Sequence, residues 1–220
     1  MNKKLNTIII ICSTFIHLNS VAQKQTIKPD LLNSSHFQLV HREITIYENE
    51  DKKTVVHLNN KPGDGVAWIN GVAFQKGIIE FDVKGKNVLQ QSFVGIAFHG
   101  LNDSDFDAVY FRPFNFQSPD TIRKSHSVQY ISLPHYDWSA LREKYPGKYE
   151  NALVHTVDPE KWFHAKIIVD ADYITVYVND DKKPSLKIKP ITDRTTSKIG
   201  FWVGNNSDGD FSNLTIINNK

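Results

Sequence analysis

The stretch that decides the fold of this 220-residue chain reads WFHAKIIV at residues 162–169, YITVYVN at 173–179, KIGFWVG at 198–204 and FSNLTI at 211–216. These four short runs are rich in β-branched and aromatic residues. Asp, Gly, Asn and Pro interrupt the chain between them. Short runs of this kind, separated by turn-forming residues, are typical of consecutive antiparallel strands in a β-sandwich.

Similar runs fill the middle of the chain, and one stretch breaks the pattern. Asp137 can cap a short helix over 138–144, and Gly147 can end it, inside a long loop. Counting the runs predicts about ten to thirteen short strands, which favours an all-β jelly-roll sandwich of two antiparallel sheets with one short inserted helix. The strands predicted upstream of the first stretch cover His36–Leu39, Glu43–Tyr47, Thr54–Leu58, Val66–Phe74, Gly77–Val83, Phe93–His99, Ala108–Phe114 and His126–Ile131.

The first residues have the features of an export signal. A basic start is followed by the apolar run 8–16 and by Ser20-Val21-Ala22. We therefore predict a signal peptide over residues 1–22 with cleavage after Ala22, an irregular lead-in over 23–35, and a single domain over 36–220. The apolar run is shorter than the roughly 20 residues that span a bilayer. The mature protein is expected to be secreted or periplasmic, without membrane insertion after signal cleavage.

The composition of the chain argues against several kinds of chemistry and of binding partner. Cys12 is the single cysteine and lies in the predicted signal peptide, so the mature chain is expected to have neither disulfides nor thiolate chemistry. The net charge is only +2, and the basic residues are scattered along the chain. No nucleic-acid partner and no membrane-binding face are therefore expected.

The alternation of residues along two predicted strands separates their faces. Val94, Ile96 and Phe98 form one face of the first strand, and Gly95, Ala97 and His99 form the other. The two small residues leave room over the sheet for a ligand, or they allow another segment to pack closely there.

In the next strand Tyr110 and Arg112 share one face, whereas Asp107 lies on the other. An arginine beside aromatic rings can hold a sugar hydroxyl or a carboxylate, or it can pair with an aspartate to fix two strands. Gln129 is a candidate hydrogen bonder to a ligand, or a core glutamine that satisfies the backbone. Trp138 can stack on a sugar ring, although sandwich cores also use tryptophan.

Carboxylates bear on the question of glycoside cleavage. Sandwich glycosidases of family 16 carry the pattern Glu-x-Asp-x-Glu on one strand, and retaining enzymes need two carboxyl groups about 5 Å apart. Here Glu80 and Asp82 begin that pattern, but Lys84 takes its last place. Alternation on a solvent-facing strand explains Glu80 and Asp82 equally well. A different pair among Asp103, Asp105, Asp107, Glu143 and Glu150 stays open.

One loop could bind a hard cation. Residues 205–210 read NNSDGD, and calcium prefers such oxygen ligands, so Asp208 and Asp210 are candidate calcium ligands. An ordinary turn uses the same residue types. The histidines show no spacing typical of a zinc site.

Several blocks of this chain, taken together, resemble a known family. The most distinctive reads DAVYFRPFNF at residues 107–116; the others lie at 93–99, 126–131, 146–151 and 158–164. They resemble exported bacterial proteins with a concanavalin A-like domain, similar to the 3-keto-disaccharide hydrolase family that is often labelled family 16 glycoside hydrolase. Gln129 matches that family, whereas His99, Ser127 and Ser132 stand where it has arginine, glutamate and aspartate.

The resemblance implies a concanavalin A-like jelly roll with a carbohydrate ligand on its concave face. We expect Tyr110, Arg112, Gln129 and Trp138 to contact that ligand. If the protein is an enzyme, glycoside hydrolysis is the expected reaction, with His99 or His126 as general acid or base and Asp107 as the carboxylate partner. The alternative is a non-catalytic lectin-like or structural interaction module, because a fold does not fix a function.

Overall fold

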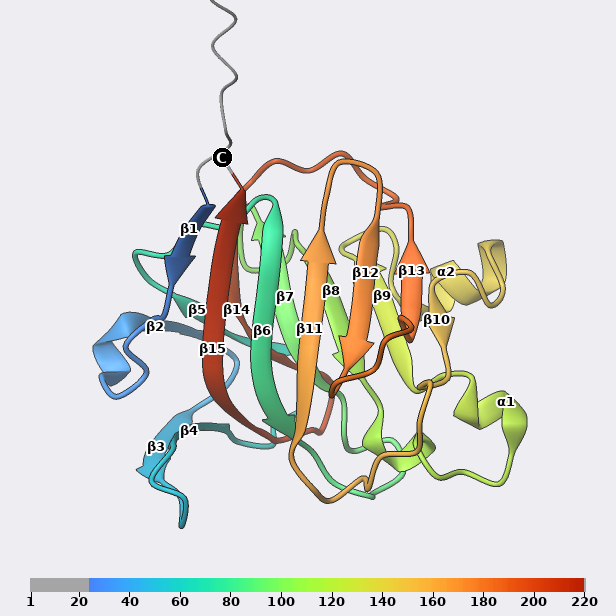
Figure 1. Cartoon of the computed structure of the whole chain (residues 1–220), viewed down its shortest axis with the longest axis horizontal. Helices are drawn as coiled ribbons and strands as arrows, with labels where there is room; N and C mark the ends of the chain where they lie inside the picture. Colours follow the sequence, from blue (N-terminus) through green and yellow to red (C-terminus); the bar gives the residue numbers. More distant parts are fainter. Residues whose placement is uncertain (1–23, 220) are drawn as a thin grey trace, which may run out of the picture.

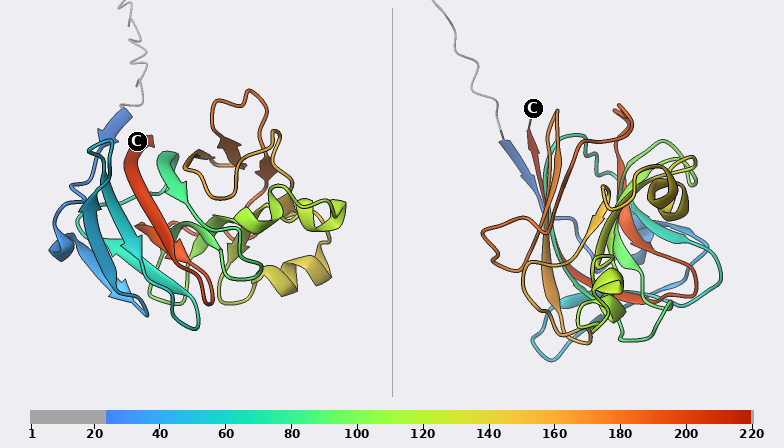
Figure 2. Two further views of the ribbon diagram at one scale, coloured as in Figure 1. Left: turned by 90° about the horizontal axis from the view of Figure 1, so that it is seen from below. Right: turned by 90° about the vertical axis from the view of Figure 1, so that its right-hand side faces the viewer.

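The computed structural model describes residues 24–219, which form two antiparallel β-sheets packed face to face. Figure 2 (right) shows the two sheets edge-on as two layers, and this confirms the predicted sandwich. The predicted signal peptide and its cleavage site after Ala22 lie outside the described residues. Among residues 24–219, no helix has the length and apolar character needed to cross a bilayer.

The sheet nearer the viewer in Figure 1, called sheet A, has eight strands. Its order is β13-β12-β11-β6-β15-β4-β3, and β1 pairs with β15 beside this path. Its strands are β1 (Lys24–Ile27), β3 (Ile44–Glu48), β4 (Thr54–Leu58), β6 (Gly77–Lys84), β11 (Phe163–Val169), β12 (Ile174–Val178), β13 (Leu186–Ile188) and β15 (Gly209–Asn219).

The second sheet, sheet B, has seven strands in the order β10-β9-β8-β7-β14-β5-β2. Its strands are β2 (Phe37–Val40), β5 (Gly65–Ile69), β7 (Val94–Gly100), β8 (Asp107–Phe111), β9 (Val128–Ser132), β10 (Glu150–Asn151) and β14 (Lys198–Val203). The last two predicted runs therefore lie in different sheets, β14 in sheet B and β15 in sheet A.

Aromatic rings from both sheets join the two layers. Phe201 of β14 stacks on Phe211 of β15 with ring centroids 4.6 Å apart, and Phe81 of β6 lies 6.5 Å from each of them. All three side chains are fully buried. Burying one such side chain stabilises a fold by about 1.5–3 kcal/mol, so this trio is a central part of the core.

The inserted helix is confirmed and a shorter one was not predicted. Helix α2 (Trp138–Lys144) begins at Asp137, whose Oδ1 accepts a hydrogen bond from the Ala140 backbone N–H at 2.7 Å. Helix α1 (Thr121–Lys124) is a single turn, too short to give a periodic signal. The 3₁₀ turns η1 (Ser34–His36) and η2 (Pro113–Asn115) complete the helical elements.

Four expected boundaries were wrong. The strand expected to begin at His126 begins at Val128. Lys24–Ile27 is not irregular but forms β1, because it pairs along β15 in register Lys24↔Asn219. The strand expected to reach Phe74 ends at Ile69, where a turn places Gly71 at φ +75°. The strand expected to reach Phe114 ends at Phe111 because Pro113 begins the turn η2.

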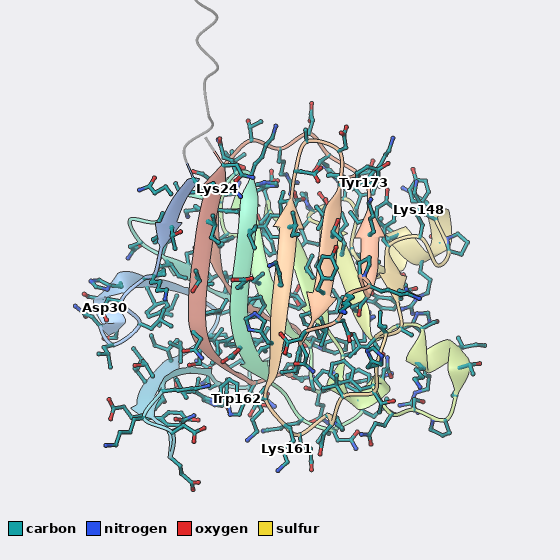
Figure 3. All side chains as sticks on the ribbon, in the orientation of Figure 1. Lys24, Asp30, Lys148, Lys161, Trp162 and Tyr173 are labelled. Atoms are coloured by element: carbon teal, nitrogen blue, oxygen red, sulfur yellow. The ribbon has the colours of Figure 1, made fainter. Side chains whose placement is uncertain are left out.

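The outer face of sheet A carries polar cross-strand pairs. Glu80 pairs with Lys166 at 3.0 Å, and Asp82 pairs with His164 at 2.9 Å. The Asp82 hydrogen bond raises the pKa of His164 against the opposing effect of burial. This is the face turned to the viewer in Figure 3, where Tyr173 marks the start of β12. Glu80 and Asp82 thus lie on the solvent face of sheet A, as alternation alone predicts.

The loops that matter for function gather at one end of the sandwich. Strands β5, β7 and β9 begin there, while β8 and β14 end there, because neighbouring strands of sheet B are antiparallel. Segments 59–64, 85–93, 112–127 and 204–208 therefore meet, at the lower end of the molecule in Figure 1. The start of β1 and the end of β15 lie at the upper end of the molecule.

Candidate functional site

A cavity of about 670 Å³ opens where these loops meet on the outer face of sheet B. Helix α2 and the segment before it form one wall. Its aromatic and apolar lining is Leu89, Phe93, Tyr110, Phe114, Ile131, Leu133, Pro134, Trp138 and Trp202; its charged and polar lining is Asp64, Gln90, Arg112, Asn115, Arg123, His126, Asp137, Arg142 and Asn205.

The floor of the cavity is a closed hydrogen-bond triangle. Arg112 Nη2 donates to the Tyr110 hydroxyl at 2.7 Å and to Gln129 Oε1 at 2.5 Å, and the same hydroxyl donates to Gln129 Oε1 at 3.0 Å. The sheet brings these residues together because Tyr110 of β8 pairs directly with Gln129 of β9. Burial raises the pKa of Tyr110 to about 12, so its hydroxyl keeps its proton and donates.

Aromatic rings and a backbone carbonyl hold Arg112 further. Its guanidinium lies 5.0 Å from the centre of the Tyr110 ring and 5.6 Å from that of Phe93, a cation–π arrangement. Nη1 donates to the His126 carbonyl at 3.0 Å. Only 7% of the Arg112 side chain is exposed, so the guanidinium is fixed before any ligand arrives.

Glu150 of β10 lies beneath the cavity floor and is close to three basic side chains, those of Arg112, His126 and Arg142. Its carboxylate accepts two hydrogen bonds from Arg142, from Nε at 2.9 Å and from Nη2 at 2.6 Å. Oε2 also lies 2.9 Å from His126 Nδ1 and 3.7 Å from Arg112 Nη1. With 3% of its side chain exposed, Glu150 is a structural counter-ion rather than a group that a ligand reaches.

The surroundings favour a neutral His126. Burial lowers its pKa, and the nearby arginines Arg142 and Arg112 act in the same direction, while Glu150 opposes them. A neutral imidazole can accept or donate a proton, which is the property that general acid–base chemistry needs.

Two carboxylates lie on another part of the cavity lining. Asp64, in the loop before β5, keeps contact with solvent, yet the protein atoms around it desolvate the carboxylate and raise its pKa. Arg42 opposes this shift, and Asp137 adds to it by like-charge repulsion. Asp137 itself is committed to capping α2.

Gly95 allows two aromatic rings to meet over the sheet. It pairs with Tyr110 on one side and with Trp202 on the other, and the two rings approach to 4.9 Å between centroids. A Cβ atom at Gly95 would lie 2.2 Å from the Val109 carbonyl oxygen. The space predicted above Gly95 is therefore taken up by the backbone of the neighbouring strand β8 and by the rings of Tyr110 and Trp202.

The other half of this outer face is covered. Trp68 of β5 is buried, packs edge-on against Phe106 at 5.5 Å, and donates its indole N–H to Asp103 at 3.0 Å. The segment after β7 thus closes one half of sheet B. The half with Tyr110 and Trp202 stays open.

The rim carries exposed apolar side chains. Trp138 is 49% exposed, and the Arg142 guanidinium lies 5.1 Å from its ring centre, which props the indole at the mouth. Leu89 is 54% exposed in the loop before β7. An exposed indole beside a hydrogen-bonding floor is suited to stacking on a flat, partly apolar ligand.

His99 and Asp107 form a separate cluster. His99 Nδ1 lies 2.9 Å from Asp107 Oδ2, and Nε2 lies 2.7 Å from the Gln75 carbonyl. Arg194 also pairs with Asp107, at 3.2 Å. His99 was expected on the face of Gly95 and Ala97, but its φ of +53° and a register shift in the β7–β14 pairing turn it toward Asp107. Neither residue lines the cavity.

The predicted calcium ligands have other partners. Asp208 pairs with Lys86, and Asp210 lies 2.7 Å from His57 Nδ1. Both carboxylates line a smaller cavity of about 430 Å³ together with Lys86 and His57. Over residues 24–219, no three His, Cys, Asp or Glu side chains are grouped as a metal site requires. Asp208 is thus held by a lysine and Asp210 by an imidazole, and each carboxylate would have to leave that partner to serve as the predicted calcium ligand.

Four of the seven residues predicted for catalysis or ligand contact line one cavity: Tyr110, Arg112, His126 and Trp138. Gln129 lies directly beneath it and holds two of them. Sequence reasoning missed Asp64, Phe93, Arg123 and Arg142 as members of the site. The available signal was topological, since the loops before β5, β7 and β9 must meet at one end of an antiparallel sheet.

Comparisons with known proteins bear on the fold. No protein-family model matches the chain, and no curated protein sequence matches it. Among solved structures, it is similar to the carbohydrate-binding module CBM66 from Bacillus subtilis, with 12% identity, a TM-score of 0.51, and 84% of this chain and 92% of the other covered. It is also similar to the exoplasmic/lumenal domain of VIP36 in its Ca²⁺/Man3GlcNAc-bound form, with 11% identity, a TM-score of 0.53 and 87% of each chain covered.

A third similar structure is a glycoside hydrolase family 16 endo-glucanase from Bacteroides ovatus, with 12% identity, a TM-score of 0.53, and 92% of this chain and 96% of the other covered. At such low identity these similarities establish shape alone. Together with the two antiparallel sheets described above, they show that this chain has the concanavalin A-like sandwich fold.

Proposed function

We propose that this protein binds carbohydrate in the cavity on the outer face of sheet B. The observation that carries the proposal is the pairing of a fixed polar floor with an exposed indole. Arg112, Tyr110 and Gln129 hold one another in place, and Trp138 stands at the mouth. Sugars present hydroxyls at their edges and apolar C–H groups on their faces, so such a cavity matches both. The similar structures of a carbohydrate-binding module and of the Man3GlcNAc-bound VIP36 domain support this.

The test is a glycan-array screen followed by calorimetry on the mature chain. Trp138→Ala is expected to weaken binding at least about tenfold, which is about 1.4 kcal/mol. Tyr47→Ala is the matched control, because Tyr47 is also an exposed aromatic residue, at 42%, but belongs to β3 of sheet A. Equal loss in both variants, or binding to no glycan, would contradict the proposal.

A second candidate function is glycoside hydrolysis in the same cavity. Asp64 favours it, because its pKa is raised and it lines the cavity together with Asp137 and His126. A carboxyl group with a raised pKa is better suited to act as a general acid, while a second group serves as base or nucleophile. Mass spectrometry on every bound glycan tests this: cleavage that Asp64→Asn abolishes, with binding retained, supports the enzyme, and intact ligand supports a lectin-like module.

We also propose that the protein is exported. We infer from the signal peptide predicted over residues 1–22 that the protein is exported to where extracellular or periplasmic glycans occur. Sequencing the N-terminus of the protein recovered from its native host is expected to begin at Gln23. A mature protein that retains residues 1–22 would contradict export by signal cleavage.

A further inference from the structure

The cavity has more positive charge than its carboxylates neutralise. Arg142 takes both oxygens of Glu150. Arg112 is therefore left with three neutral acceptors, the Tyr110 hydroxyl, the Gln129 amide oxygen and the His126 carbonyl, and lies 3.7 Å from a carboxylate that Arg142 already holds. A guanidinium that is 7% exposed without a carboxylate of its own is costly, and a ligand anion would remove that cost.

Arg123 adds a second cation at the same cavity. It lies in α1, lines the cavity, and has no carboxylate within 4.0 Å among residues 24–219. Because its side chain is only half-buried, it can move toward a ligand at small cost.

The remaining carboxylates of the cavity have partners of their own. Arg42 lies behind Asp64 and offsets its charge, and Asp137 caps α2. The lining of the cavity holds three arginines, at 112, 123 and 142, and two carboxylates, at 64 and 137. Outside the lining, Arg42 acts on Asp64 and Glu150 pairs with Arg142. One positive charge remains, and the two arginines without their own carboxylate are Arg112 and Arg123.

We propose that the ligand is an acidic glycan, with the carboxylate of a uronic acid residue held by Arg112 and Arg123. This inference rests on the proposed carbohydrate-binding function. A planar carboxylate matches the fork of a guanidinium, and the fixed Arg112 loses little freedom on binding it. Asp64 and Asp137 would repel the same group, so they orient the uronate with its hydroxyls toward them.

The experiment compares acidic oligosaccharides with their own neutral counterparts. Oligogalacturonate, oligoglucuronate and alginate oligomers are titrated by calorimetry beside the same chains after chemical reduction of the carboxyl groups, which keeps length and linkage. We expect at least one acidic chain to bind about tenfold or more tightly than its reduced form, with affinity that falls as salt is added. A sulfated neutral glycan distinguishes the uronate from other anions.

Variants that remove the same charge at different places test which residues cause the preference for the acidic chain. Arg123→Gln is expected to remove most of the preference for the acidic chain without unfolding the protein, because its side chain is partly exposed. Lys198→Gln removes the same charge from the covered half of sheet B, where Lys198 lies 5.5 Å from the Trp68 ring centre, and should leave the preference unchanged. Arg112→Lys keeps the charge but loses the fork, so it should weaken acidic binding more than neutral binding.

The possible outcomes distinguish the claim that the protein binds carbohydrate from the claim that its ligand is acidic. Equal or tighter binding of the reduced chains, with dependence on Trp138, would overturn the acidic specificity while the carbohydrate function stands. Tighter binding of the sulfated glycan than of any uronate would overturn the uronate assignment. Binding to none of these chains, acidic or neutral, would overturn the inference together with the proposed function.

Discussion

Arg142 and Glu150, eight residues apart, form a two-point ion pair that ties helix α2 to strand β10, with N···O distances of 2.9 and 2.6 Å. The helix would otherwise have little to fix it beyond the buried Leu141. The pair therefore sets the position of Trp138 at the start of the same helix, and with it the mouth of the cavity.

Removing the carboxylate of this pair should lower the free energy of unfolding substantially. Glu150→Gln removes the carboxylate that Arg142 holds and the negative charge 3.7 Å from the buried Arg112. Breaking a fully buried ion pair costs about 3–5 kcal/mol, and the loss here should lie at or below the lower end of that range because the Arg142 side chain is 34% exposed. Urea denaturation measures the loss. Glu80→Gln is the control, because its pair with Lys166 has side chains that are 26% and 37% exposed and should contribute about 0–1 kcal/mol. Similar losses in the two variants would show that Glu150 is not buried as described.

The small residue beneath the cavity floor should not tolerate a methyl group. In Gly95→Ala the new Cβ would meet the Val109 carbonyl oxygen at 2.2 Å and Tyr110 Cα at 2.6 Å, both backbone atoms that cannot rotate away. We expect a loss of about 1–3 kcal/mol or more in the free energy of unfolding. Gly147→Ala is the comparison, since nothing lies within 4 Å of its Cβ position and only its φ of +71° opposes the change. A harmless Gly95→Ala would mean that the Tyr110–Trp202 contact is looser than described.

The pair of His57 and Asp210 predicts a pH dependence. The Asp210 hydrogen bond raises the pKa of His57, so the imidazolium is stabilised in the folded state. Its contribution is full below the unfolded value of about 6.5 and is lost as the pH rises through the folded value. Asp210→Asn should therefore lower stability more at pH 5.5 than at pH 8.5. The difference should stay below about 1 kcal/mol because the His57 side chain is 31% exposed.

An NMR titration checks that assignment within one spectrum. In Asp210→Asn the pKa of His57 should fall, while that of His164, whose partner is Asp82, should not move. A shift of both, or of neither, would contradict the pairing.

Trp138 should report ligand binding. It is 49% exposed, whereas Trp68 and Trp202 are 1% and 3% exposed. The fourth tryptophan, Trp162, is half-buried and does not line the cavity. A sugar ring stacked on this indole would shield it from water, so a bound glycan should change the fluorescence and protect it from acrylamide. Trp138→Phe should remove most of that change while Trp68, Trp162 and Trp202 still emit. Protection from acrylamide that is equally strong in this variant would contradict stacking of the glycan on Trp138.

Alternation of residues was enough to predict most strands of this sandwich. In β6, residues 77–84 alternate between buried and half-buried side chains, as the sequence of Ile79, Phe81 and Val83 indicates. The same reasoning predicted the shared face of Tyr110 and Arg112. It could not predict β1, since Lys24–Ile27 is polar and becomes a strand only by pairing with β15.

The residues of the site were harder to predict from the sequence, because most of them come from loops or depend on irregular backbone. His99 leaves its expected face at a bulge, and no periodic pattern signals a positive φ at a histidine. His126 precedes β9 rather than lying within it, so alternation says nothing about its direction. Glu150 appeared as one loop carboxylate among several, and only the fold brings it to Arg142 and Arg112.

The pairing of β1 with β15 has a practical consequence. Lys24 and Asn219 are direct neighbours across the sheet, at the opposite end of the sandwich from the loops that form the cavity. A short linker between these two positions would allow circular permutation without crossing the ligand site. An affinity tag or a solid support attached at either position would leave the cavity facing outward, which suits the protein to use as an immobilised capture reagent.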